Sequence, residues 1–288
     1  MPKVEGCPFC PENIQARVPL FSEDILPDGR LSKGECLLFP NMFPFAEHHA
    51  VATLTKQHFV GIGGFQPRSV ADNLSCVLQY VEVVHRRDRR ARYPIYIWNH
   101  LPPSAASIVH PHTQAIVDRR PTPYQRRLLA ASRAYHRRHG RSFWQDLAIE
   151  ERHRGERYIG ENRSLWAVAS YAPQGNREVQ LIFKKGSSLD GLEEEQVGDF
   201  ADALARVLRG YAGMGVDSFN LSTFSGPLGV ELPYYSLHAR VISRPVLRAY
   251  YRNDTGPLER LHHEADIEVA PEAVAQALRP FFGPSIPS

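Results

Sequence analysis

The chain repeats one order of elements twice, and this repeat constrains the fold more than any other feature of the sequence. Each copy reads as two strands, an amphipathic helix, a strand, a loop and a last strand. In the first copy these elements cover residues 37–45, 50–55, 69–89, 93–98 and 108–117. In the second copy they cover residues 165–170, 178–183, 192–211, 218–223 and 236–243. The pattern predicts two related halves, each built from strands and a helix.

The repeat divides the chain into an N-terminal half over residues 1–150 and a C-terminal half over residues 151–288. An Arg-rich helical region over residues 122–154 lies between the repeated segments. A final helix is expected over residues 271–282, with Pro at its start. A length of 288 residues allows either one large domain or two small ones.

The two copies differ where chemistry would be expected. By sequence correspondence, His58 of the first copy becomes Gly186 in the second, and His112 becomes Arg240. The Cys-x-x-Cys pair near the N-terminus has no counterpart in the second copy. These differences indicate a duplicated fold in which only the first half carries the chemistry.

The composition excludes several classes of function. A hydrophobic fraction of 43% and a charged fraction of 23% are typical of a globular chain. The net charge of +3 permits an anionic ligand without indicating nucleic acid, and the Arg-rich runs at 86–92 and 126–138 are not interleaved with aromatic residues. We find no signal peptide and no apolar run long enough to cross a membrane. The four cysteines indicate thiolate chemistry in a reducing compartment, so we expect a cytoplasmic protein.

The segment around His110, His112 and Gln114 is the strongest candidate for a reactive site. It reads as a strand, and alternate residues of a strand share one face, so we expect these three side chains to lie side by side. A neutral imidazole at His112 can attack phosphorus without a separate base, and the Gln114 amide can donate to a phosphoryl oxygen. The alternative is that His112 is a hydrogen-bonded core residue.

Two further features indicate a metal and an anion. Cys7 and Cys10 have the spacing of a zinc knuckle, but two thiolates supply only half of a tetrahedral site; the alternative is a pair of reduced thiols. Asn99 and Ser107 flank a loop that can present backbone N–H groups to an anion, and ordinary turn chemistry is the alternative.

These residues together resemble galactose-1-phosphate uridylyltransferase, the transferase branch of the histidine-triad superfamily. The likeness runs along most of the chain. It is carried by Cys7-Pro-Phe-Cys10, Asn41, Phe43, His58, the run Asn99…Ser107-x-x-His110-Pro-His112-x-Gln114, Ser236-Leu-His238-Ala and the helix over 271–279.

The resemblance implies an α+β fold of two histidine-triad-like halves, with an antiparallel sheet flanked by helices. It implies one structural zinc per chain, held by Cys7, Cys10, His58 and His110. His112 would form a covalent nucleotidyl-histidine, and Gln114 would contact the α-phosphate. Phe39, Asn41 and Phe43 would border the nucleoside, and Asn99 and Ser107 would touch the phosphates. The resemblance also implies a homodimer.

Three departures from the family pattern are visible. Met42 stands where the family has an acidic residue that contacts the ribose, which leaves the base open. Asp266 falls where the family has a glutamine that reads the hexose, which leaves the sugar open. Some members bind a second metal through a Glu and three His; only His238 of that set is evident here and Arg240 stands at another of its positions, so no second metal is expected.

The sequence therefore predicts a zinc-containing nucleotidyltransferase that works by double displacement. The default substrates are UDP-glucose and galactose 1-phosphate, which would place the protein in galactose metabolism. Phosphorolysis of an ADP-sugar, with inorganic phosphate as acceptor, is the alternative within the class. A nucleotide hydrolase of the same superfamily is a second alternative, although a glutamine at 114 suits a transferase better than the third histidine of the hydrolases. A non-catalytic nucleotide-binding protein is the third.

Overall fold

One ten-stranded antiparallel sheet organises the molecule. The computed structural model describes residues 5–246 and 254–283. The strands follow the order β1-β2-β3-β5-β4-β9-β10-β8-β7-β6, and every neighbouring pair is antiparallel. The bounds are β1 (Leu31–Lys33), β2 (Cys36–Pro40), β3 (His48–Thr53), β4 (Tyr93–His100), β5 (His112–Asp118), β6 (Tyr158–Glu161), β7 (Leu165–Ala169), β8 (Val179–Phe183), β9 (Ser218–Phe224) and β10 (His238–Arg244).

The predicted duplication is confirmed by the topology. Strands β1 to β5 form one half of the sheet and β6 to β10 the other, and the strand order of the second half mirrors that of the first about the β4–β9 pair. Each half places one long helix between its third and fourth strands, α2 (Pro67–Arg87) in the first and α5 (Glu194–Gly213) in the second. The two halves therefore share one continuous sheet.

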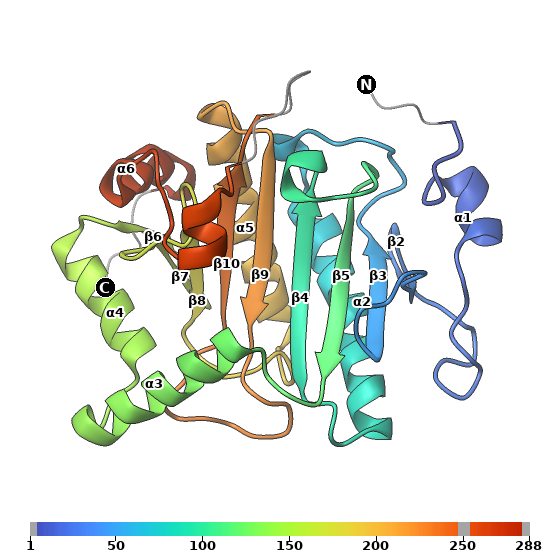
Figure 1. Cartoon of the computed structure of the whole chain (residues 1–288), viewed down its shortest axis with the longest axis horizontal. Helices are drawn as coiled ribbons and strands as arrows, with labels where there is room; N and C mark the ends of the chain where they lie inside the picture. The colour runs from blue at the N-terminus through green and yellow to red at the C-terminus, as the bar shows by residue number, and fades with distance from the viewer. Residues whose placement is uncertain (1–4, 247–253, 284–288) are drawn as a thin grey trace.

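The long helices cover one face of this sheet and form the main core. Helices α2 and α5 lie behind the central strands in Figure 1 and pack against each other. Buried side chains of α2, among them Leu74 and Val77, meet Trp98 of β4 and Ala115 of β5. The opposite face of the central strands carries His112, Gln114 and Asn99, and we call it the site face.

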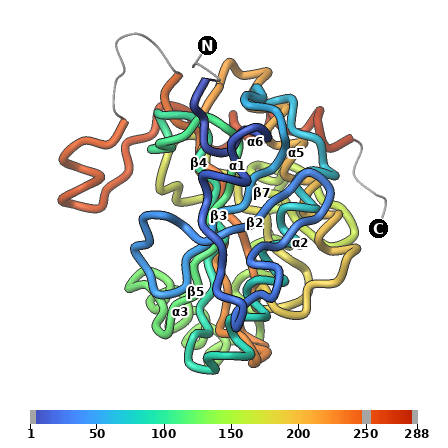
Figure 2. Tube along the Cα trace, turned by 90° about the vertical axis from the view of Figure 1, so that its right-hand side faces the viewer, coloured from blue at the N-terminus to red at the C-terminus, as the bar shows by residue number. Residues whose placement is uncertain are grey.

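The remaining helices lie at the ends and on the flank of the sheet. They are α1 (Pro11–Arg17), α3 (Pro123–His139), α4 (Phe143–Arg154) and α6 (Pro271–Phe282), with short turns η1 (Ile62–Gly64), η2 (Pro102–Ser104) and η3 (Leu258–His262). Figure 2 shows the N-terminal segment with α1 running beside β2 and β3. Among the described residues, no helix combines the length and apolarity needed to cross a membrane.

Most predicted elements are present, with instructive differences. The helices predicted over 69–89 and 271–282 correspond to α2 and α6. The helical region predicted over 122–154 consists of the two helices α3 and α4, and Gly140 ends α3 in the left-handed conformation, with φ of +71°. The short edge strands β1 and β6 and the short helix α1 were not predicted. The division expected between residues 150 and 151 falls inside α4 and stays a prediction.

The strand that carries His112 and Gln114 is shorter than predicted. It begins at His112, and residues 108–111 precede it as irregular chain. Pro111 has no N–H to donate to a ladder, although its carbonyl still accepts from the Leu54 N–H. The prediction that His110 shares a strand face with His112 and Gln114 is therefore wrong, and only the latter two belong to β5.

The backbone also corrects the correspondence between the halves. In the first half, the Leu54 N–H donates to the Pro111 carbonyl, and His112 begins β5. In the second half, the Phe183 N–H donates to the Leu237 carbonyl, and His238 begins β10. His238, rather than Arg240, therefore occupies the place of His112.

In the second half that place is filled by aromatic rings. The His238 imidazole lies between the indole of Trp144 in α4 and the ring of Phe224, with ring centroids 3.9 Å and 5.1 Å away. It is fully buried, and burial holds its pKa well below the usual value. The ring is therefore part of a packed core.

Buried Asn73 of α2 ties the helix to the strands that carry the site. Its amide donates to the Ala52 and Thr53 carbonyls, and its oxygen accepts from the hydroxyls of Tyr96 and Thr113. All these partners lie on β3, β4 and β5, away from solvent.

We expect Asn73→Ala to lower the free energy of unfolding by about 3 kcal/mol, because it leaves several buried polar groups unpaired. Urea denaturation measures this change. Gln79→Ala, on the exposed side of the same helix, is the control and should alter stability by less than about 0.5 kcal/mol. A value for Asn73→Ala as small as the control would contradict the role of this network.

Candidate active site and metal centre

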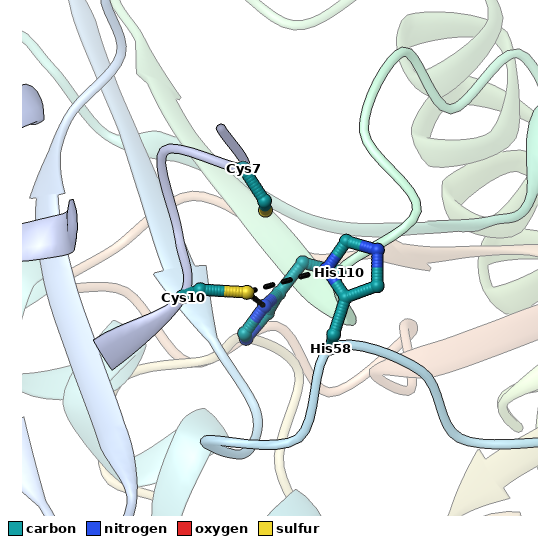
Figure 3. A group of neighbouring side chains, drawn as sticks. All are labelled: Cys7, Cys10, His58 and His110. Atoms are coloured by element: carbon teal, nitrogen blue, oxygen red, sulfur yellow. Dashed lines mark hydrogen bonds between the residues drawn. The ribbon is translucent and has the colours of Figure 1, made fainter. Parts of the chain in front are cut away.

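Four side chains predicted to bind metal come together at the N-terminal edge of the site face. One ligand atom from each of Cys7, Cys10, His58 and His110 lies within 4.8 Å of all the others. Cys10 Sγ is 3.3 Å from His58 Nδ1 and 3.6 Å from His110 Nδ1 (Figure 3). The group joins the start of α1, the loop after β3 and the segment before β5, which are far apart in the sequence.

The surroundings prepare these atoms to bind a cation. His110 Nε2 lies 2.8 Å from the Thr55 carbonyl, which can only accept, so the proton is on Nε2 and the Nδ1 lone pair faces Cys10. Burial lowers the pKa of His110 to about 4, so this imidazole is neutral at physiological pH. Burial, together with the adjoining Cys7 thiol, raises the pKa of Cys10 to about 12. A bound divalent cation would lower the pKa of these thiols again, because its charge stabilises the thiolates.

The donor set therefore fits a metal ion. Two thiols and two imidazoles in mutual contact match the ligand types and number of a closed tetrahedral site. Cys7 and Cys10 are held in a turn, because the Asn13 amide donates to the Cys7 carbonyl and the N–H of Asn13 to the Cys10 carbonyl.

His112 is placed so that one defined ring nitrogen faces the site. Its Nδ1 lies 2.8 Å from the carbonyl of His110, so Nδ1 carries the proton and Nε2 carries the lone pair. Burial lowers the pKa of His112 below its usual value, although the carbonyl contact acts in the opposite direction. The Phe9 ring packs edge-on against this imidazole at a centroid distance of 5.2 Å. The side chain is therefore a neutral imidazole in a fixed orientation, with the proton on Nδ1 and the lone pair on Nε2.

Gln114 is oriented by a histidine that the sequence analysis missed. His49 Nε2 donates to Gln114 Oε1 at 2.8 Å, and burial lowers the pKa of His49, so this ring is neutral. With its oxygen occupied, Gln114 presents its NH2 group to the site. Asn41 contacts the same His49 ring. Strand alternation over 48–53 was the available signal, because it places His49 on the face of Val51 and Thr53.

The predicted nucleoside contacts fall into two groups. Phe43 is 82% exposed, Asn41 accepts from the Phe43 N–H, and neighbouring Phe45 is 72% exposed and packs edge-on against His49. Phe39, in contrast, is only 1% exposed and packs beneath Phe9. The structure thus gives Phe39 a supporting position, and its contact with a nucleoside stays a prediction.

Asn99 and Ser107, the two predicted phosphate contacts, lie before and after the loop that follows β4. Trp98 pairs with Thr113, so the next residue, Asn99, lies beside His112 on the site face. Ser107 is exposed in the segment that leads to His110. Between them, Leu101 and Ala105 have φ of +68° and +67°, a conformation that non-glycine residues adopt at a cost. Their contacts with phosphate stay predictions.

A pocket extends from Asn99 into the second half. Its volume is about 440 Å³. It is lined by Ile97, Asn99, Tyr124, Asn220, Arg240 and Ile242, among others. Arg240 lies 3.5 Å from Glu178 and donates to the Tyr124 hydroxyl, so its charge is compensated at the pocket wall. The arrangement places the His112 imidazole, the Gln114 and Asn99 amides and a largely apolar cavity on one face of the sheet.

Comparison with solved structures identifies this class of fold. The chain superposes on a uridylyltransferase with a TM-score of 0.79 at 20% identity, covering 98% of this chain and 91% of the other. It superposes on an ADP-glucose phosphorylase from Arabidopsis thaliana with bound ADP-glucose with a TM-score of 0.79 at 19% identity, covering 97% and 92% of the two chains. A galt-like protein from the same plant gives 0.77 at 19% identity, with coverages of 96% and 92%. The predicted α+β fold class is confirmed, and the chain shares its fold with these three solved structures.

A sequence relative defines the family more narrowly. The chain is 30% identical over 275 residues to an uncharacterized protein of Archaeoglobus fulgidus, covering 95% of this chain and 80% of the relative. The chain belongs to the same family as this archaeal protein. No family model matches the chain.

We expect the Cys7→Ser, Cys10→Ser double variant to lose bound metal and stability together, because it removes half of the donor set. Metal analysis of the purified protein and thermal unfolding measure the two effects. Cys36→Ser is the control, since Cys36 lies in the main core outside the cluster. Full metal occupancy in the double variant would show that these thiols are not ligands.

Proposed function

We propose that the protein is a nucleotidyltransferase that carries a nucleoside monophosphate on His112. The observation that supports this most is the fixed orientation of two neighbouring side chains. The His110 carbonyl leaves Nε2 of His112 with its lone pair, and His49 leaves Gln114 with its NH2 group toward the same space. This pairs a nucleophile with a hydrogen-bond donor, which a nucleophilic displacement at phosphorus requires.

The reaction would proceed in two displacements. His112 Nε2 attacks the α-phosphorus of a nucleotide sugar, the bond from that phosphorus to the bridging oxygen breaks, and the sugar 1-phosphate leaves with the electron pair. A phosphate oxygen of the acceptor then attacks the same phosphorus, and the bond to Nε2 breaks. The Gln114 NH2 group donates to the non-bridging oxygens, where charge builds. Two displacements give retention at phosphorus and ping-pong kinetics.

The metal cluster would have a structural role. Cys7, Cys10, His58 and His110 would hold one zinc ion, which supplies cross-linking of the N-terminal segment to the sheet. The cluster is linked to His112 through His110, because the backbone carbonyl of His110 accepts the hydrogen bond that orients the His112 ring. We do not propose a second metal in the second half, where His238 is packed between rings.

Two sets of substrates are proposed. UDP-glucose with galactose 1-phosphate is the default, consistent with the likeness to a uridylyltransferase. ADP-glucose with inorganic phosphate is the alternative, consistent with an equal TM-score to an ADP-glucose phosphorylase. Exposed Phe43 and Phe45 offer ring faces to either base. A homodimer in the cytoplasm completes the proposal.

Incubation with UDP-glucose and ADP-glucose labelled at the α-phosphate tests the proposal. We expect an acid-labile protein adduct with at least one of them, lost in His112→Asn and retained in His153→Asn, a surface histidine of α4. An adduct that water removes rapidly would indicate a hydrolase instead. Nucleotide binding without any adduct would indicate a non-catalytic protein.

We also expect His49→Phe to slow adduct formation by about 10-fold to 100-fold, because the Gln114 amide would lose its fixed orientation. Nucleotide binding and metal content should change little. Single-turnover kinetics measure the effect, and His48→Gln, the adjacent residue, serves as control. A wild-type rate in His49→Phe would remove His49 from the site.

A further inference from the structure

The second half of the sheet contributes two polar residues that reach Asn99, the residue beside His112. Asn99 of β4 pairs directly with Asn220 of β9 across the junction of the halves. Asn220 in turn pairs with Ile242 of β10, and Arg244 lies further along that strand on the same face. These residues extend the site face from His112 into the half that lacks a nucleophile.

The hydrogen bonds among them run in one direction. Arg244 Nη1 donates to Asn220 Oδ1 at 3.1 Å. Asn220 Nδ2 donates to Asn99 Oδ1 at 2.6 Å and to the Ser104 carbonyl at 2.9 Å. The second guanidinium nitrogen of Arg244 donates to Asp254, which holds the arginine in place.

The two ends of this chain of bonds determine its polarity. An amide side chain can usually be turned over, exchanging its donor and acceptor ends. Here a guanidinium can only donate and a backbone carbonyl can only accept, so Arg244 and Ser104 together leave Asn220 a single orientation. The Asn220 NH2 group then requires the oxygen of Asn99 to face it. The NH2 group of Asn99 must therefore face away from Asn220.

Asn99 Nδ2 thus remains as a donor beside His112. No described residue accepts a hydrogen bond from it, and Asn99 lines the pocket that extends away from the nucleophile. A group leaving from a phosphorus attacked by His112 must depart on the side opposite the attacking nitrogen. The pocket of about 440 Å³ offers space for a sugar on the far side of Asn99.

We propose that Arg244 and Asn220 are positioning residues, which turn the NH2 group of Asn99 toward a phosphate. This phosphate belongs to the sugar 1-phosphate that leaves in the first displacement and to the acceptor that attacks in the second. The inference rests on the proposed nucleotidyl transfer and assigns a task to the half without a nucleophile. Asn99 meets the substrate, while Asn220 and Arg244 act only through Asn99.

The test uses Asn220→Asp. A carboxylate accepts from Arg244 as the amide does, but it has no hydrogen for Asn99 and would accept from the Asn99 NH2 group instead. Asn99 would then turn over and present its oxygen to the phosphate. We expect adduct formation from UDP-glucose or ADP-glucose to slow by on the order of 100-fold. Gln79→Glu adds the same charge on exposed α2 and should leave the rate unchanged.

A binding experiment separates orientation from chemistry. In a His112→Asn background no adduct forms, and affinities for nucleotide sugars and for UMP and AMP are measured by calorimetry. Asn220→Asp should weaken the nucleotide sugars by at least about 10-fold and leave UMP and AMP unaffected, because only the sugars carry the second phosphate. Equal weakening of both classes, or of neither, would overturn the inference.

Arg244 supplies an independent pair of variants. Arg244→Met removes the donor that orients Asn220, and Arg244→Lys keeps one. If adduct formation is slow in Arg244→Met and close to the wild-type rate in Arg244→Lys, the result supports the hydrogen-bonded order Arg244, Asn220, Asn99 even if Asn220→Asp fails to fold. Equal rates in both variants would refute it. If the wild type forms no adduct with any nucleotide sugar, the proposed transfer fails, and the binding experiment still decides the orientation of Asn99.

Discussion

Antiparallel pairing of β5 with β3 and β4 is the constraint on which the whole site depends. It places Gln114 opposite Val51 and Ile97, and it brings Asn99 beside His112. A slip of one residue in either pairing would turn these polar side chains into the helix-covered core. Asn73, bonded to β3, β4 and β5 at once, opposes such a slip from the other face. Register and reactivity are therefore set by the same contacts.

The two halves share one architecture but differ in the surroundings of an equivalent histidine. His112 and His238 occupy equivalent strand positions, and each places Nδ1 against the carbonyl two residues earlier. In the first half the ring borders the site, whereas in the second Trp144 occupies the adjoining space. The same strand position thus borders a cavity-bearing face in one half and belongs to the packed core in the other. At the junction of the halves, Asn220 and Arg244 of the second half carry the hydrogen bonds that reach Asn99.

Much of this could be predicted from the sequence, and the failures have physical causes. Hydrophobic periodicity identified α2, and the family resemblance named the four clustered Cys and His residues. The face of His110 was mispredicted because Pro111 interrupts the ladder, a local effect that alternation ignores. His49 was missed because its importance comes from Gln114, which is 65 residues away in sequence. The direction of the Asn99 amide depends on two strands of the other half, and no local pattern encodes it.

The position of Phe9 has a consequence for control of the protein. This residue stands between the two thiols in the sequence, and its ring rests on the imidazole of His112. Its ring is also packed against Phe39, while its backbone lies between Cys7 and Cys10. If the cluster holds an ion as proposed, oxidising the thiols or removing the ion would loosen the ring beside His112 without altering His112 itself. The activity of the proposed transferase would then depend on the redox and metal status of the surroundings through one aromatic side chain.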